Sequence, residues 1–170
     1  MNILRGIAIC TLILVLNQFY CVKKENRYKS ALGFSFLIPD EIEISDTVNV
    51  RTAPKTGNIS IRHKINPECL NGSIEPFLPI SPEEFFENLS NERNLSGTHT
   101  YLQKKAEITE KNGLFSAEVS YYNEDSHDYK PAVIGAFELK DELWIVMLRW
   151  DCDEQIFSQQ TKLIISSLHF

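Results

Sequence analysis

Compact catalytic motifs are absent from this 170-residue sequence. It has no G-x-S-x-G elbow, no Walker phosphate loop and no H-E-x-x-H zinc motif. It also lacks a Lys/Arg cluster in the part expected to fold, and its net charge is −6. Nucleic-acid binders usually present a basic face, so nucleic acids and acidic membrane surfaces are poor candidate partners. No two of the histidines have a zinc-ligand spacing: His63, His99, His127 and His169.

Two groups of acidic residues need no explanation beyond folding. Residues 123–128 are polar, but they lack the glycine and the alternating carboxylates of a calcium loop. We interpret them as a solvated hairpin loop. Asp151, Asp153 and Glu154 precede a predicted helix, where carboxylates complement the helix dipole. The sequence therefore predicts no catalytic residue, no metal site and no cofactor.

Long apolar runs are also scarce, and the one at residues 7–16 follows a short start with a single cation, Arg5. A membrane-spanning helix needs about 20 apolar residues, and Asn17 and Gln18 interrupt this run. A short apolar core after a cationic start is typical of a secretion signal. We interpret residues 1–21 as that signal, and we expect the protein to be exported.

The residues at the end of the signal indicate how the protein is attached to a membrane. Residues 17–20 offer no pair of small residues for ordinary cleavage. Cys21 follows directly and resembles the acylated cysteine of a bacterial lipoprotein, although Tyr20 stands where a small residue is usual. We expect a lipid on Cys21, a tether over residues 22–30 and one folded domain over residues 31–170. A secreted form and an uncleaved anchor are the alternatives.

Cysteine is rare: the chain has four, and Cys10 and Cys21 belong to the signal segment. Cys69 and Cys152 remain as an even pair in an exported domain. Oxidising compartments favour disulfides, so we predict a Cys69–Cys152 bond. Two separate thiols are the alternative.

The apolar pattern predicts strands on both sides of one clear helix start. Alternation indicates strands at residues 33–39, 42–51 and 59–65, and three prolines with a glycine indicate a loop over residues 66–79. Ser81, Pro82 and Glu84 have the spacing of a helix N-cap, first helical residue and capping box. The sequence thus predicts a helix directly after the loop.

Four strands and a final helix follow. Asn112-Gly113 suits a tight hairpin turn between strands at residues 98–110 and 114–122. The second of these strands has one wet face. The strands at residues 132–139 and 143–150 are apolar on both faces, so we expect them at the centre of a sheet that is covered on both sides. The final helix is expected to bury Ile156, Phe157, Leu163, Ile164 and Leu168.

This order predicts an α+β fold, a mainly antiparallel sheet with helices packed on it. The opening strand, Gly33-Phe34-Ser35-Phe36-Leu37-Ile38-Pro39, and the closing Ile164-Ile165-Ser166-Ser167-Leu168 resemble the PsbP-like family. The resemblance implies an α/β/α sandwich, as in thylakoid-lumen subunits and small bacterial lipoproteins. It also implies an accessory or binding role without a shared catalytic set, and it transfers no functional residue.

Two functional hypotheses follow from these observations. The first is a non-enzymatic accessory or binding lipoprotein of the cell envelope, which contacts an envelope protein or a small ligand. The second is an envelope enzyme whose site is assembled from scattered His, Asp and Glu residues. The expected contact surface is the loop over residues 66–80, with Phe77, Leu78 and Ile80 spaced by prolines. The alternative is that these apolar residues simply cover the sheet.

Overall fold

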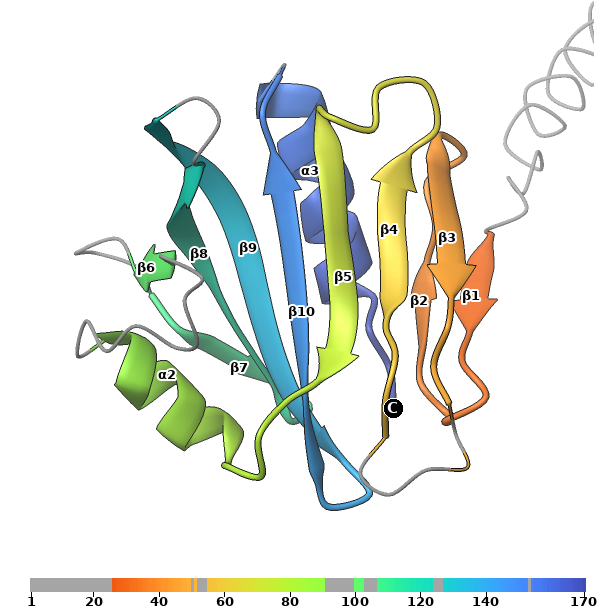
Figure 1. Ribbon diagram of the computed structural model, residues 1–170, viewed down its shortest axis with the longest axis vertical. Coiled ribbons are helices and arrows are strands. Elements are labelled where there is room, and N and C mark those ends of the chain that lie inside the picture. Colours follow the sequence, from red (N-terminus) through yellow and green to blue (C-terminus); the bar gives the residue numbers. More distant parts are fainter. Residues whose placement is uncertain are drawn as a thin grey trace, which may run out of the picture.

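One wide antiparallel sheet organises the chain, and Figure 1 shows it face-on. The computed structural model describes residues 26–49, 51, 55–90, 100–102, 107–123, 127–152 and 154–170. The predicted signal and Cys21 therefore lie outside the described residues. The strands of this sheet stand in the order β3 (Ile42–Asp46), β4 (Ile59–His63), β5 (Leu70–Pro76), β10 (Glu142–Trp150), β9 (Asp128–Leu139), β8 (Leu114–Asn123) and β6 (Thr100–Leu102), while β7 (Thr109–Lys111) pairs with another part of β8.

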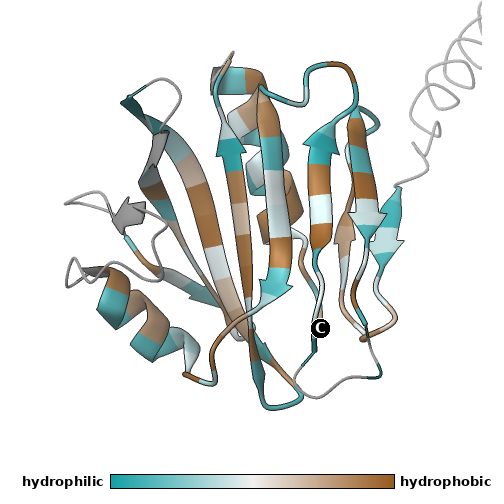
Figure 2. Ribbon diagram, in the orientation of Figure 1, coloured by the Kyte–Doolittle hydropathy of each residue, from teal (hydrophilic) through white to brown (hydrophobic). Residues whose placement is uncertain are grey.

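The β9–β10 hairpin is buried on both faces, as its sequence predicts. Trp144, Val146 and Leu148 enter one hydrophobic cluster, whereas Leu143 and Ile145 enter a second cluster on the opposite face. Figure 2 shows apolar residues along the middle of both strands and hydrophilic ones at the turn between them. The hairpin therefore needs cover from two layers.

Two helices and a small hairpin supply that cover. Helix α3 (Glu154–Ser166) packs on one face together with β1 (Arg27–Lys29) and β2 (Ser35–Leu37), which form a separate two-stranded sheet. Helix α2 (Pro82–Ser90) packs on the other face through Phe85, Phe86 and Leu89. The predicted α+β class is confirmed. Neither of these described helices is long and apolar enough to cross a membrane.

Local signals set the element boundaries as predicted. The Glu84 amide donates to Ser81 Oγ at 3.1 Å, so Ser81 caps α2. Asn112 and Gly113 both have positive φ, 54° and 79°, as a tight turn between β7 and β8 requires.

The predicted loop over residues 66–79 is wrong, because half of it, residues 70–76, is strand β5. That strand pairs with β4 on one side and with β10 on the other. Its Asn71-Gly72-Ser73 stretch resembles a turn, but Gly72 is needed for a different reason. A Cβ at Gly72 would collide with the Met147 carbonyl, so the glycine permits the close approach of β5 to β10.

Two further predictions need correction. The predicted strand at residues 98–110 is two short strands, β6 and β7, that pair with different parts of β8. The buried face of α3 is also rotated from the prediction. Ile156 and Leu163 are 52% and 42% exposed, whereas Thr161 and Ile165 are buried. Thr161 can be buried because its hydroxyl donates to the Ser158 carbonyl at 2.9 Å.

The predicted tether is too long at its C-terminal end, because residues 27–29 form β1. Tyr28 packs against Phe36, with ring centroids 5.1 Å apart, and its hydroxyl hydrogen-bonds the Asp46 carboxylate on β3. Burial, and then the Asp46 contact, raise the pKa of Tyr28 well above its usual value. This residue joins the small hairpin to the main sheet.

Cys69 and Cys152 are brought together as a disulfide pair, with Cα atoms 4.9 Å apart. Cys69 precedes β5, and Cys152 follows β10 just before α3 begins. Leu70 and Trp150 are register partners, and the Asp151 amide donates to the Cys69 carbonyl at 3.0 Å. The bond therefore extends the β5–β10 ladder by one step and holds the start of α3 at that end of the sheet.

We expect Cys152→Ser to lower the free energy of unfolding by about 2–5 kcal/mol, because the bond closes a long loop of the unfolded chain. Urea unfolding followed by circular dichroism measures this loss. Reduced wild-type protein is the control, and it should match the variant. Unchanged unfolding midpoints for both would contradict the role assigned to the bond.

Candidate functional site: a groove beside the last helix

A groove of about 710 Å³ lies between the C-terminal half of α3 and the β7–β8 hairpin. It exists because β8 is polar on this face: Ser116 and Glu118 alternate with the buried Ala117 and Val119. Helix α3 packs over β9 and β10 and ends at Ser166. The corner beyond it is left open to solvent.

The floor of the groove is apolar. It is lined by Leu114 and Val133 of the sheet and by Ile165 and Leu168 at the C-terminal end of α3. The first three are buried and belong to the same hydrophobic cluster. The floor is therefore a continuation of the main core and is held as rigidly as the core itself.

One wall carries an ion pair across the groove. Lys162 Nζ on α3 lies 2.7 Å from Glu118 Oε1 on β8. Both side chains are more than half exposed, so the pair stabilises the fold by no more than about 1 kcal/mol. The pair spans the mouth of the groove from helix to strand.

The other wall is built where three segments meet. The Arg27 guanidinium donates to the Ser167 carbonyl at 3.4 Å and to Ser35 Oγ at 3.2 Å. Ser167 Oγ accepts a bond from the Leu37 amide at 2.8 Å. His169 and Ser35 exchange backbone bonds of 2.8 and 2.9 Å. These contacts satisfy carbonyl groups at the end of α3 and fix β1, β2 and the C-terminus around the groove.

The groove thus has an apolar floor with a ring of hydroxyl and charged groups. Its cations are Arg27, Lys111 and Lys162, and its carboxylates are Glu107 and Glu118. Ligand sites typically combine an apolar lining with a few orienting polar groups in such a volume. This arrangement can bind a small ligand that has an apolar part and polar ends.

The polar residues singled out from sequence do not converge at this site. His63 is buried at the end of β4, where its ring contacts Phe157 and its Nδ1 accepts the Asn66 amide at 3.1 Å. His127 is exposed in the β8–β9 turn, and His99 lies outside the described residues. His169 is the predicted histidine that lines the groove.

Of the acidic residues expected at the helix start, Asp151 pairs with Lys130 of β9. Asp151 Oδ1 lies 2.9 Å from Lys130 Nζ, and Asp128 lies 4.0 Å from the same nitrogen. The hydrogen bond that Lys130 donates to Asp151 raises the pKa of Lys130. Asp153 lies outside the described residues. Within the described part of the chain, no three His, Cys, Asp or Glu residues are grouped to hold a metal ion.

The three residues of the predicted contact surface differ in exposure. Phe77 is half-buried and packs edge-on against Phe85 of α2, with centroids 5.6 Å apart. Ile80 packs against the same cluster, while Leu78 is 60% exposed. Phe77 and Ile80 therefore cover the sheet, which leaves Leu78 as the exposed residue of the predicted surface. The groove was not predicted from the sequence. The polar face of β8 and the amphipathic pattern of the last helix could have indicated it.

Comparisons with known proteins bear on the fold. No protein-family model matches the chain, and no curated protein sequence does so. The solution structure of cyanobacterial PsbP (CyanoP) from Synechocystis matches with a TM-score of 0.53 at 15% identity, covering 85% of this chain and 91% of that one. The protein therefore has a PsbP-like fold, as the sequence resemblance predicts.

A second solved structure is also similar. LpqN, which is involved in cell envelope biogenesis of Mycobacterium tuberculosis, matches with a TM-score of 0.46 at 10% identity, covering 85% of this chain and 84% of that one. At that TM-score the likeness adds nothing to the conclusion about the fold.

Phe77→Ser should lower the free energy of unfolding by roughly 1.5–3 kcal/mol, because it removes an aromatic ring from the sheet cover. Leu78→Ser is the matched control and should change it by less than about 0.5 kcal/mol, because the side chain is already exposed. Thermal melting distinguishes the two. Equal losses would show that Leu78 also belongs to the core.

Proposed function

We propose that this protein is a non-enzymatic binding protein of the bacterial cell envelope, anchored by a lipid on Cys21, which holds a small ligand in the groove between α3 and β8. The observation that carries the proposal is the groove, whose rigid apolar floor and polar rim suit a ligand with an apolar part and polar ends. The Cys69–Cys152 pair supports export, because disulfides persist in oxidising compartments.

The lipid anchor rests on the sequence. Cys21 ends the apolar run, and only Val22 to Asn26 separate it from Arg27 on the rim of the groove. An extended chain spans at most about 3.6 Å per residue. Six residue steps, from 21 to 27, therefore reach no more than about 22 Å. An acylated Cys21 would keep the groove close to the membrane surface, where ligands and partners are concentrated locally.

Metabolic labelling with a palmitate analogue tests the anchor. We expect the label on the wild-type chain and its complete loss in Cys21→Ala. Cys10→Ala is the matched control and should keep the label, because Cys10 lies inside the apolar run. Label that survives Cys21→Ala, or a soluble product that starts at another residue, would contradict the proposed attachment.

Blocking the groove tests ligand binding. The probe is anilinonaphthalene sulfonate, which has an apolar ring system and one anionic group. Ser166 is exposed on the rim of the groove, so Ser166→Trp should weaken probe binding by about tenfold or more, or about 1.4 kcal/mol. Gln159→Trp, which is also exposed on α3 but away from the lining, should leave binding unchanged. Fluorescence titration measures both.

Unchanged melting temperatures would show that both tryptophan variants remain folded. Equal probe affinity in the wild type and both variants would overturn the assignment of the groove. That outcome would leave the labelling result unaffected, so the anchor and the binding site are tested separately.

A further inference from the structure

The lining of the groove carries more positive than negative charge. Its cations are Arg27, Lys111 and Lys162, and its carboxylates are Glu107 and Glu118. With His169 neutral at pH 7, the lining has an excess of one positive charge. The whole chain has a net charge of −6. The groove therefore has the opposite sign of charge to the protein that contains it.

Two of these cations are not neutralised within the structure. Lys162 is paired with Glu118, whereas no carboxylate of the described residues, the terminal one included, lies within 4.0 Å of the Arg27 or Lys111 side-chain nitrogens. Both side chains are exposed, so a ligand from solvent can reach them.

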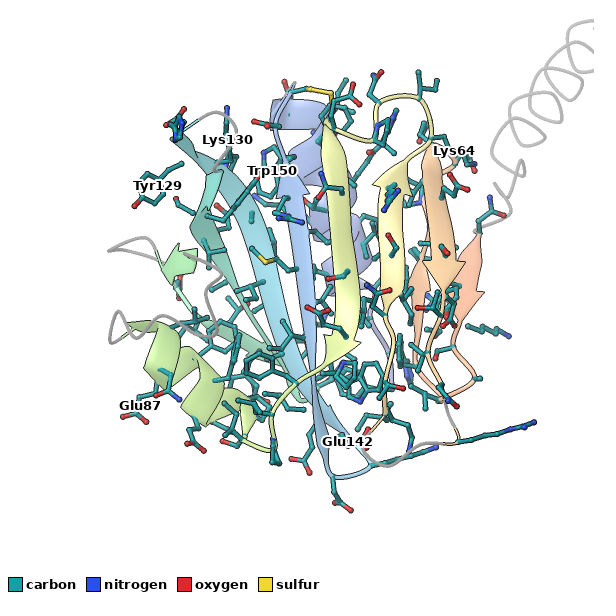
Figure 3. All side chains as sticks on the ribbon, in the orientation of Figure 1. Lys64, Glu87, Tyr129, Lys130, Glu142 and Trp150 are labelled. Atoms are coloured by element: carbon teal, nitrogen blue, oxygen red, sulfur yellow. A yellow bond between two sulfur atoms is a disulfide. The ribbon has the colours of Figure 1, made fainter. Side chains whose placement is uncertain are left out.

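Other lysines of the described chain do have acidic partners. Lys130 lies 2.9 Å from Asp151, and Lys55 lies 4.0 Å from Glu142. Figure 3 labels Lys130 and Glu142 near opposite ends of the sheet. The unneutralised charge of the groove is therefore a property of its own lining.

Contacts between neighbouring segments place both free cations toward one end of the groove. Arg27 donates to Ser35 Oγ, and Ser35 exchanges backbone bonds with His169. The next residue, Phe170, has its ring against Gly113, in the same turn that follows Lys111.

The unpaired carboxylate of the lining lies toward the other end. Lys111 is opposite Leu114 in the β7–β8 ladder, and Thr109 is opposite Ser116. The chain before β7 therefore runs from Thr109 toward Glu118, which places Glu107 near the Lys162–Glu118 pair and away from Lys111. The groove is thus polarised along its length.

The end of α3 does not cancel this positive charge. Carbonyl groups at a helix C-terminus carry partial negative charge that would oppose an anion. Here the Ile164 carbonyl accepts the Ser167 hydroxyl at 3.0 Å, and the Ile165 carbonyl accepts the Leu168 amide at 3.2 Å. Arg27 uses Nη1 for the Ser167 carbonyl and for Ser35. Its Nη2 and Nε groups are further donors that can bind a ligand.

We infer that the ligand of the groove is an amphiphile with an anionic head group, which binds between Arg27 and Lys111 while its apolar chain lies on the floor of Leu114, Val133 and Ile165. The inference rests on the proposed ligand-binding function of the groove and adds the charge and the orientation of the ligand. A guanidinium fork matches the oxygens of a carboxylate and of a phosphate. The head group could therefore come from a fatty acid or from a phosphorylated lipid.

Isothermal titration calorimetry of the full-length chain tests the charge of the ligand. The probes are octanoate, octyl phosphate and octanamide, which have apolar chains of similar length, and octanamide is uncharged. We expect at least one anionic probe to bind about tenfold more tightly than octanamide, because charge-assisted hydrogen bonds are stronger than neutral ones. Added sodium chloride should reduce this preference, since both cations are exposed.

Two variants test the position of the head group. Arg27→Gln and Lys111→Gln should each lower the affinity for the anionic probe by about fivefold or more and leave that for octanamide unchanged. Lys29→Gln is the matched control, because Lys29 is exposed on the same strand as Arg27 but does not line the groove. If Arg27→Gln does not fold, Lys111→Gln still decides, because the Lys111 side chain makes no ion pair with a described residue.

The outcomes separate this inference from the proposed function. Tighter binding of octanoate supports a fatty acid, and tighter binding of octyl phosphate supports a phosphorylated lipid. Equal affinities for all three probes, each abolished by Ser166→Trp, would overturn the anionic head group and leave the groove as the binding site. Equal losses in Lys29→Gln, Arg27→Gln and Lys111→Gln would overturn the position of the head group. Binding of no probe would overturn both the inference and the function proposed for the groove.

Discussion

The burial of the β9–β10 hairpin on both faces is the constraint on which the rest of the structure depends. This strand pair carries Trp144 and Phe137 on one face and Leu143 and Ile134 on the other. It therefore cannot lie at the edge of the sheet or leave either face exposed to solvent. It must lie in the middle, with neighbours on both edges and a layer on each face. The positions of β5 and β8, of α2 and α3, and of the β1–β2 hairpin all satisfy this requirement.

The two layers cover the sheet unequally. We expect the function to reside in the surfaces that they leave exposed. Helix α3 is too short and too central to cover β8, which leaves the groove beside Lys162 and Glu118. Helix α2 packs on the opposite face against β6 and β9, and Met147 and Arg149 of β10 stay partly exposed on that face. A rigid core with two uncovered surfaces suits a protein that holds a ligand and meets a partner.

Much of the fold could be predicted because its signals are local or periodic. Alternation marked β9 and β10 as central, Ser81 marked the start of α2, and Asn112-Gly113 marked a turn. Strand β5 was missed because the three prolines and Gly72 of residues 66–79 indicated a loop, whereas the glycine permits the close approach of β10. The groove and the setting of Arg27 depend on which residues from distant segments become neighbours. Such neighbours follow from strand register and helix placement, which no single stretch of sequence contains.

Hydrogen exchange of backbone amides tests the central constraint most directly, because it ranks segments by the free energy that opens them. If the doubly buried hairpin holds the fold, amides of residues 132–137 and 143–148 should exchange last and together, at the free energy of global unfolding. The amides of β1 and β7, whose strands are short and have one neighbour each, should exchange earlier by local opening. Exchange of the β9–β10 amides as early as those of β1 would contradict the account.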